Sequence, residues 1–128
     1  MKRLTVNETW EQCLAMWKWI SRQCKVKSYR ESIYDYKEAW STKNGYKEGD
    51  IRELCFFCHK GQLRLAATKL PKREWLTKYA TSQCPYCPAM DIDSDFDCFN
   101  SEYHFELKPR LFYAELKRLN KIRLAKKK

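Results

Sequence analysis

Hydrophobic residues recur at helical spacing in three parts of this 128-residue chain. In the first part, apolar side chains return every three or four residues, at Trp10, Cys13, Leu14, Trp17 and Ile20. A helix places such residues on one face. Thr5-Val6-Asn7-Glu8 precedes them and fits a capping box, in which a hydroxyl and a carboxylate bind the first backbone N–H groups. We expect a helix from about Val6 to about Gln23.

The second part has the same period, at Tyr29, Ile33, Tyr36 and Trp40. Ser28-Tyr29-Arg30-Glu31 fits a second capping box. Asn44-Gly45 is a natural stop, because both residues tolerate the left-handed conformation. We expect a helix from about Tyr29 to about Thr42, which forms an antiparallel hairpin with the first helix within residues 1–45.

The third part lies near the C-terminus. Pro109 suits the first position of a helix. An apolar stripe follows it, at Phe112, Leu116, Leu119 and Ile122, and the other faces are basic. We expect a basic amphipathic helix and tail over residues 108–128.

The pattern between these helices is different. Gln62 to Ala67 and Asn100 to Leu107 place apolar residues at every second position, which indicates short strands, although a helix fits the first run nearly as well. Ile51 to Phe57 is expected to run extended. Residues 1–128 are therefore expected to form a single domain with an α+β, mostly α fold.

Cysteine spacing gives the strongest chemical signal. Cys55 and Cys58 form one Cys-x-x-Cys pair, and Cys84 and Cys87 form another after a gap of 25 residues. Two such turns can offer four thiolates to one Zn²⁺, so we expect a closed, structural zinc site in a zinc-ribbon-like or treble-clef-like unit over residues 51–107. Cys98 is a possible substitute for one of the four ligands.

The same cysteines allow other interpretations. Cys55-x-x-Cys58-His59 matches the attachment pattern of a c-type haem, and Cys84-Pro85-Tyr86-Cys87 matches a glutaredoxin active site. Four thiolates can also hold an iron–sulfur cluster. Without a secretory signal or a membrane-spanning run, we expect a reducing cytoplasm, where thiols favour metal binding over disulfides.

A local acidic cluster follows the second cysteine pair. Asp91, Asp93, Asp95 and Glu102 fall at positions 1, 3, 5 and 12 of a calcium loop, but Phe96 stands where that loop needs glycine. A solvated loop, or one that neutralises the basic C-terminal segment, is the simpler interpretation.

Charge narrows the choice of partners. The net charge is +10, and residues 108–128 carry +8 of it, with nine basic residues and one acid. A basic helix suits nucleic-acid phosphates, and Phe112 and Tyr113 can stack on bases. The candidate contacts are Lys108, Arg110, Lys117, Arg118, Lys121 and Arg123. The alternative is a docked helix with a merely solvated basic face.

Catalytic residues are few. A nuclease of the His-Asn-His type also uses paired zinc knuckles, and His104 with Asn100 and Asp97 is the one candidate cluster. The chain has no Asp-His dyad for it, and no histidine follows His104. We therefore expect a non-enzymatic, zinc-stabilised binding protein with a nucleic-acid partner, and keep the metal-dependent nuclease as an alternative.

Several motifs together resemble small, uncharacterised bacteriophage-encoded proteins. They are Trp17-x-Trp19, Cys55-Phe56-Phe57-Cys58, Cys84-Pro85-Tyr86-Cys87-Pro88, Cys98 and Pro109-x-x-Phe112-Tyr113. The resemblance carries no assigned activity. It implies a bacterial cytosol and a second alternative, a phage-type accessory protein that binds and inhibits a host protein.

Overall fold

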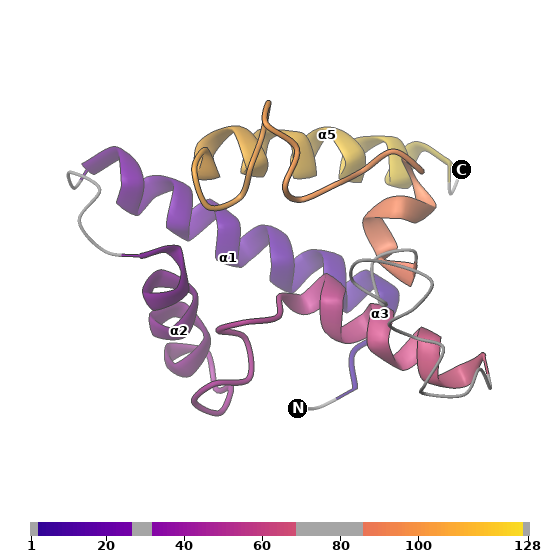
Figure 1. Cartoon of the computed structure of the whole chain (residues 1–128), viewed down its shortest axis with the longest axis horizontal. Helices are drawn as coiled ribbons and strands as arrows, with labels where there is room; N and C mark the ends of the chain where they lie inside the picture. Colours follow the sequence, from indigo (N-terminus) through magenta and orange to yellow (C-terminus); the bar gives the residue numbers. More distant parts are fainter. Residues whose placement is uncertain (1–2, 27–31, 69–85, 127–128) are drawn as a thin grey trace.

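The computed structural model describes residues 3–26, 32–68 and 86–126 (Figure 1). Within these ranges the elements are α1 (Val6–Val26), α2 (Ile33–Lys43), α3 (Phe56–Ala67), the short 3-10 helix η2 (Pro88–Asp91) and α5 (Pro109–Lys126). No strand occurs among the described residues. The expected α+β fold with a zinc-ribbon-like or treble-clef-like unit of short strands is therefore wrong.

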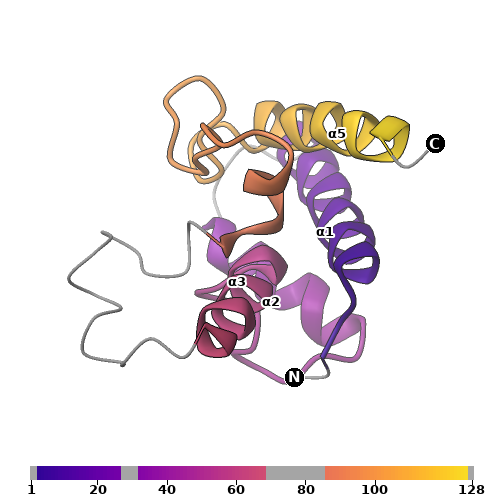
Figure 2. The ribbon, with the colours of Figure 1, turned by 90° about the vertical axis from the view of Figure 1, so that its right-hand side faces the viewer.

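Helix α1 lies at the centre of the structure. It packs against α5 on one side and against α2 and α3 on the other (Figures 1 and 2). The predicted period is confirmed for Trp10, Cys13, Trp17 and Ile20, which are buried, whereas Leu14 is half-buried. Met16 is buried as well. Among the described residues, no helix combines the length and the apolar character needed to cross a membrane.

The predicted capping box at the start of α1 is also confirmed. The backbone N–H of Glu8 donates to Oγ1 of Thr5 at 3.0 Å, and the N–H of Thr5 donates to Oε1 of Glu8 at 3.0 Å. Each side chain satisfies a donor that the helix itself leaves open.

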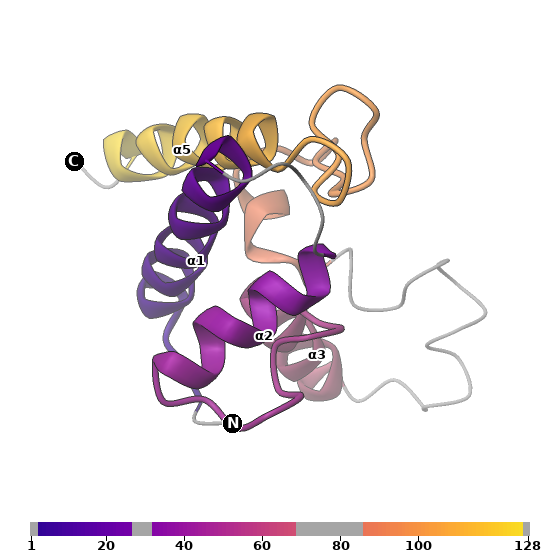
Figure 3. The same cartoon turned by 90° about the vertical axis from the view of Figure 1, so that its left-hand side faces the viewer.

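Helix α2 begins later than predicted. Ser32 caps it in extended backbone, and its hydroxyl accepts from the N–H of Asp35 at 3.2 Å. The start expected at Tyr29 is therefore wrong, and the capping box proposed for residues 28–31 lies outside the described residues. The predicted stop is confirmed, because Asn44 caps the C-terminus and Gly45 has φ of +92°. Trp19 and Tyr36 join α1 to α2, which runs at a steep angle to α1 (Figure 3).

Helix α3 replaces the first predicted strand and the last two residues of the expected extended run, of which residues 51–54 form turns and bends. The helical period buries Phe57, Gly61 and Leu65, four residues apart, and leaves Leu63 exposed. An alternation over six residues would bury Leu63 and Leu65 together. Phe57, Gly61 and Leu65 are instead buried toward α1, which is the pattern of a helix.

Residues 100–107 are turns rather than the second predicted strand. The carboxamide of Asn100 accepts from the N–H of Glu102 at 2.9 Å, and Nδ1 of His104 accepts from the N–H of Glu106 at 3.2 Å. Such side-chain bonds compete with strand pairing. The turns place Phe105 in the core, against Trp17 and Phe112.

Helix α5 follows the prediction. It starts at Pro109, and Phe112, Leu116 and Leu119 are buried against α1. The two helices are antiparallel, because Asn7 of α1 binds Arg123 near the end of α5. Edge-to-face ring contacts join α1 to α5 and to α3. The ring centres of Trp17 and Phe112 of α5 are 4.8 Å apart, and those of Trp10 and Phe57 of α3 are 4.7 Å apart.

Replacing Trp17 by alanine tests whether α1 is the centre of the fold. We expect Trp17→Ala to lower the free energy of unfolding by about 3–5 kcal/mol, because it removes a buried ring between α1 and α5. Urea denaturation followed by circular dichroism measures this loss. The control Leu124→Ala, at an exposed position of α5, should change it by less than about 0.5 kcal/mol. Equal effects of the two variants would contradict the assignment.

Candidate functional site

The first cysteine pair sits at the start of α3. Cys55 is the N-cap and Cys58 lies in the first turn, so their sulfurs face each other at 3.7 Å. Two sulfurs bound to one tetrahedral zinc at Zn–S distances of about 2.3 Å lie about 3.8 Å apart. The local helix start therefore fixes one edge of a possible thiolate tetrahedron.

The environment of Cys55 favours its thiolate. Its pKa is lowered to about 6, first by the hydrogen bond from the Cys58 thiol, then by the nearby charge of Lys37 and the N–H groups of Phe57 and Cys58. Burial acts in the opposite direction but is outweighed. The pKa of Cys58 is raised, because it holds the proton of the pair.

A small cavity of about 150 Å³ joins this pair to a third cysteine. Cys55, Cys58 and Cys98 line it, together with Lys37 of α2 and the rings of Trp17 and Phe105. Lys37 is only 2% exposed. The sequence analysis missed this lysine, although its position four residues after Ile33 and three before Trp40 places it on the buried face of α2.

Cys87 lies close to the same group. It is the N-cap of η2, which packs against α3. Burial raises its pKa most, and the neighbouring thiolates of Cys55 and Cys98 add to the increase, whereas the N–H groups of Ala89 and Met90 oppose it. Cys55 receives N–H groups from the residues two and three positions after it in the same way.

The structure thus brings together part of the predicted metal site. Cys55, Cys58 and Cys87 lie near one another with Cys98, and Cys84 is outside the described residues. In the described part of the chain, no three His, Cys, Asp or Glu side chains are placed to hold a metal ion as they stand. The described cysteines carry thiols rather than disulfides.

The acidic cluster contacts arginines. Both carboxylate oxygens of Asp91 bind Arg64 at 3.0 Å, and Asp93 lies 3.8 Å from Arg118. Oδ1 of Asp93 also accepts from the N–H of Asp95. These contacts fit a loop that offsets local basic charge, and part of that charge belongs to the C-terminal helix.

The two histidines form hydrogen bonds with backbone groups. His59 Nε2 bonds the carbonyl of Asp50, and His104 Nδ1 accepts from two N–H groups, of Glu106 and Leu107. Asn100 and Asp97 likewise accept from nearby N–H groups. The residues considered for a nuclease therefore each stabilise a local turn.

A groove of about 800 Å³ lies between the C-terminal half of α1 and the start of α5. Three of the predicted basic residues line it: Lys108, Arg110 and Lys117. The ammonium of Lys117 lies 4.7 Å from the ring centre of Tyr113, which also lines the groove. Lys121 is exposed farther along α5. The sequence analysis missed Leu107 and Leu111, two exposed leucines in the same groove.

Three predicted nucleic-acid contacts are engaged within the protein. The ammonium of Lys108 donates to the carbonyl of Ser101 at 2.7 Å. Arg118 is exposed but binds Glu115, and this hydrogen bond raises its pKa. Arg123 is only 7% exposed and binds Asn7 and Asn120. Its guanidinium lies 5.2 Å from the ring centre of Trp10.

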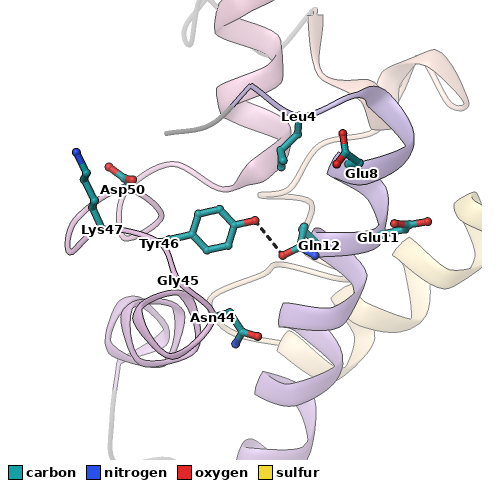
Figure 4. Close-up of a pocket in the computed structure, with 9 residues that line it drawn as sticks. All are labelled: Leu4, Glu8, Glu11, Gln12, Asn44, Gly45, Tyr46, Lys47 and Asp50. Atoms are coloured by element: carbon teal, nitrogen blue, oxygen red, sulfur yellow. Dashed lines mark hydrogen bonds between the residues drawn. The ribbon is translucent and has the colours of Figure 1, made fainter.

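The opposite end of α1 is acidic (Figure 4). A hollow of about 620 Å³ there is lined by Glu8, Glu11 and Asp50, and the hydroxyl of Tyr46 donates across it to Gln12 at 2.9 Å. The basic groove and the acidic hollow therefore lie at different ends of one helix.

No family model matches the chain, and no curated protein or solved structure is significantly similar to it.

Arg123→Lys tests whether that arginine is structural. Lysine keeps the charge, but it cannot make both bonds to Asn120 or lie flat over Trp10. We expect the free energy of unfolding to fall by about 1–3 kcal/mol, measured by urea denaturation. Lys121→Ala, at an exposed neighbouring position, should change it by less than about 0.5 kcal/mol. A neutral Arg123→Lys would return Arg123 to the candidate nucleic-acid contacts.

Proposed function

We propose that this protein binds nucleic acid through the groove between α1 and α5. The observation that carries the proposal is the grouping of Lys108, Arg110 and Lys117 around the partly exposed ring of Tyr113. Cations placed along a groove attract successive phosphates, and an aromatic ring beside them offers a base a stacking surface.

The charge distribution supports the same end of the molecule. Arg22, next to the groove residue Ser21, is exposed. Lys121 is also exposed but lies farther along α5, toward the N-terminus of α1. The acidic side chains of Glu8 and Glu11 lie at the other end of α1. A polyanion is therefore drawn to the groove end. Arg118 is left out of the contact set because it pairs with the carboxylates of Glu115 and Asp93, and Arg123 is left out because it is buried. Lys108 is kept because its partner is the neutral carbonyl of Ser101.

Single-stranded nucleic acid is the better fit. The groove combines charge with one stacking ring and two exposed leucines, which suits splayed bases more than a rigid duplex.

A protein partner is the second candidate. Leu107 is 73% exposed and Leu111 is 54% exposed, side by side with basic residues in the same groove. Exposed apolar side chains rimmed by charge are typical of protein interfaces. A nuclease-treated pull-down from bacterial lysate separates the candidates, because a protein partner remains after nuclease and is lost with Leu107→Ser and Leu111→Ser.

The charge-reversal pair Arg110→Glu and Lys117→Glu tests nucleic-acid binding. We expect affinity for a labelled single-stranded oligonucleotide at low ionic strength to fall about tenfold or more. The slope of log affinity against log salt should become shallower by about 1.4, because each lost phosphate contact on a single strand contributes about 0.7. Fluorescence anisotropy at several salt concentrations measures both.

The matched control is Lys43→Glu with Lys47→Glu. These exposed residues lie away from the groove, and the change in net charge is the same. Binding that is weakened equally by both pairs would indicate a nonspecific charge effect. Failure of the wild-type protein to bind single- or double-stranded DNA or RNA at low ionic strength would remove the proposal.

A further inference from the structure

We propose that Cys55, Cys58, Cys87 and Cys98 form a structural zinc site, in which Cys98 takes the place that the spacing of the sequence gives to Cys84. The site is independent of the nucleic-acid proposal, because it lies in the core between α1, α2 and α3 and shares no residue with the groove.

The first two ligands are already at bonding separation. The 3.7 Å between the sulfurs of Cys55 and Cys58 is the distance that one tetrahedral ion requires. Cys98 reaches the same cavity from the loop before α5. Cys87 starts the turn of η2, which packs on α3 close to Cys55. Zinc binding must draw the Cys87 and Cys98 turns onto the Cys55–Cys58 pair, since three ligands are not yet in place.

Lys37 is the independent observation that points to an anionic occupant. Its side chain is buried and lines the cavity. Its ammonium lies over the rings of Tyr34 and Phe105, at 5.7 and 5.9 Å. Among the described residues no carboxylate forms an ion pair with this ammonium, although Glu53 lines the same cavity.

A buried ammonium is stabilised by negative charge beside it. Zn²⁺ with four thiolates has a net charge of about −2, so a zinc–thiolate centre in this cavity adds negative charge next to Lys37. The cavity therefore places a buried cation beside the position proposed for the ion.

The cavity walls suit the same occupant. Trp17 and Phe105 enclose it with apolar rings, which exclude water and strengthen the bonds between thiolates and metal. The indole N–H of Trp17 is buried without a hydrogen-bond partner in the described structure. A thiolate sulfur is an acceptor for such a donor, so the zinc-bound form would satisfy it.

Thiol protection in the wild-type protein gives a direct test that needs no variant. The protein is loaded with one equivalent of Zn²⁺, alkylated, digested and read by mass spectrometry. We expect Cys55, Cys58, Cys87 and Cys98 to be protected until a chelator is added, and Cys84 to be alkylated at once. Protection of Cys84 with alkylation of Cys98 would overturn the proposal, as would a Cys55–Cys58 disulfide or bound iron in elemental analysis.

Single substitutions give the second test. Cys98→Ser should weaken zinc affinity at least tenfold in competition with a chromophoric chelator, whereas Cys84→Ser should leave it within about threefold. Cys24→Ser is the matched control, because Cys24 lies in the groove rather than in the cavity. A larger loss of zinc affinity in Cys84→Ser than in Cys98→Ser would reject Cys98 as a ligand. If a variant does not fold, the thiol-protection experiment on the wild-type protein decides the ligand assignment instead.

Lys37→Met separates the charge from the packing. Loss of the ammonium should weaken zinc affinity about tenfold or more, because a cation next to the zinc–thiolate centre is removed. It should lower the stability of the zinc-bound protein more than that of the zinc-free protein. The melting temperature is measured with zinc and with chelator. A variant that loses stability equally in both conditions would assign Lys37 a packing role only and would count against the anionic occupant.

Discussion

Burial of α1 is the constraint on which the other parts depend. Its two central tryptophans each contact more than one neighbouring element: Trp10 meets Phe57 of α3 and the guanidinium of Arg123 of α5, and Trp17 meets Phe112 of α5 and Phe105 of the preceding loop. Because aromatic rings bury large areas in fixed orientations, these contacts set where α3 and α5 lie. The cysteine pair at the start of α3 and the groove beside α5 are both positioned by this packing.

Two basic side chains are buried and therefore do not contribute to an exposed basic surface. Arg123 stabilises the contact between α1 and α5, and Lys37 faces the thiols. Arg118 is engaged by Glu115 and Asp93. The net charge of +10 therefore overstates the charge that a polyanion meets. Of the remaining basic residues, Lys108, Arg110 and Lys117 line the groove, so the proposed function depends on this local grouping rather than on the total charge.

Helices were predictable where the signal is local. A capping box and an apolar period of three to four residues define α1, and a proline with a similar stripe defines α5. The predicted strands failed because alternation over six or eight residues is weak evidence. The spacing of Leu63 and Leu65 fits a strand and also occurs in a helix, so it does not distinguish the two. Burial of Phe57, Gly61 and Leu65 against α1 favours the helix. Side-chain bonds to the backbone produced turns at residues 100–107.

The sequence by itself determined the properties that depend on near neighbours. These are the starts of α1 and α5, the stop of α2 at Asn44-Gly45, and the facing sulfurs of Cys55 and Cys58, since one helical turn fixes each of them. Only the tertiary structure decided which distant groups meet. It brought Cys98 and Lys37 to the first cysteine pair and buried Arg123 among residues 116 positions away. Such meetings depend on the packing of whole helices, which spacing along the chain does not record.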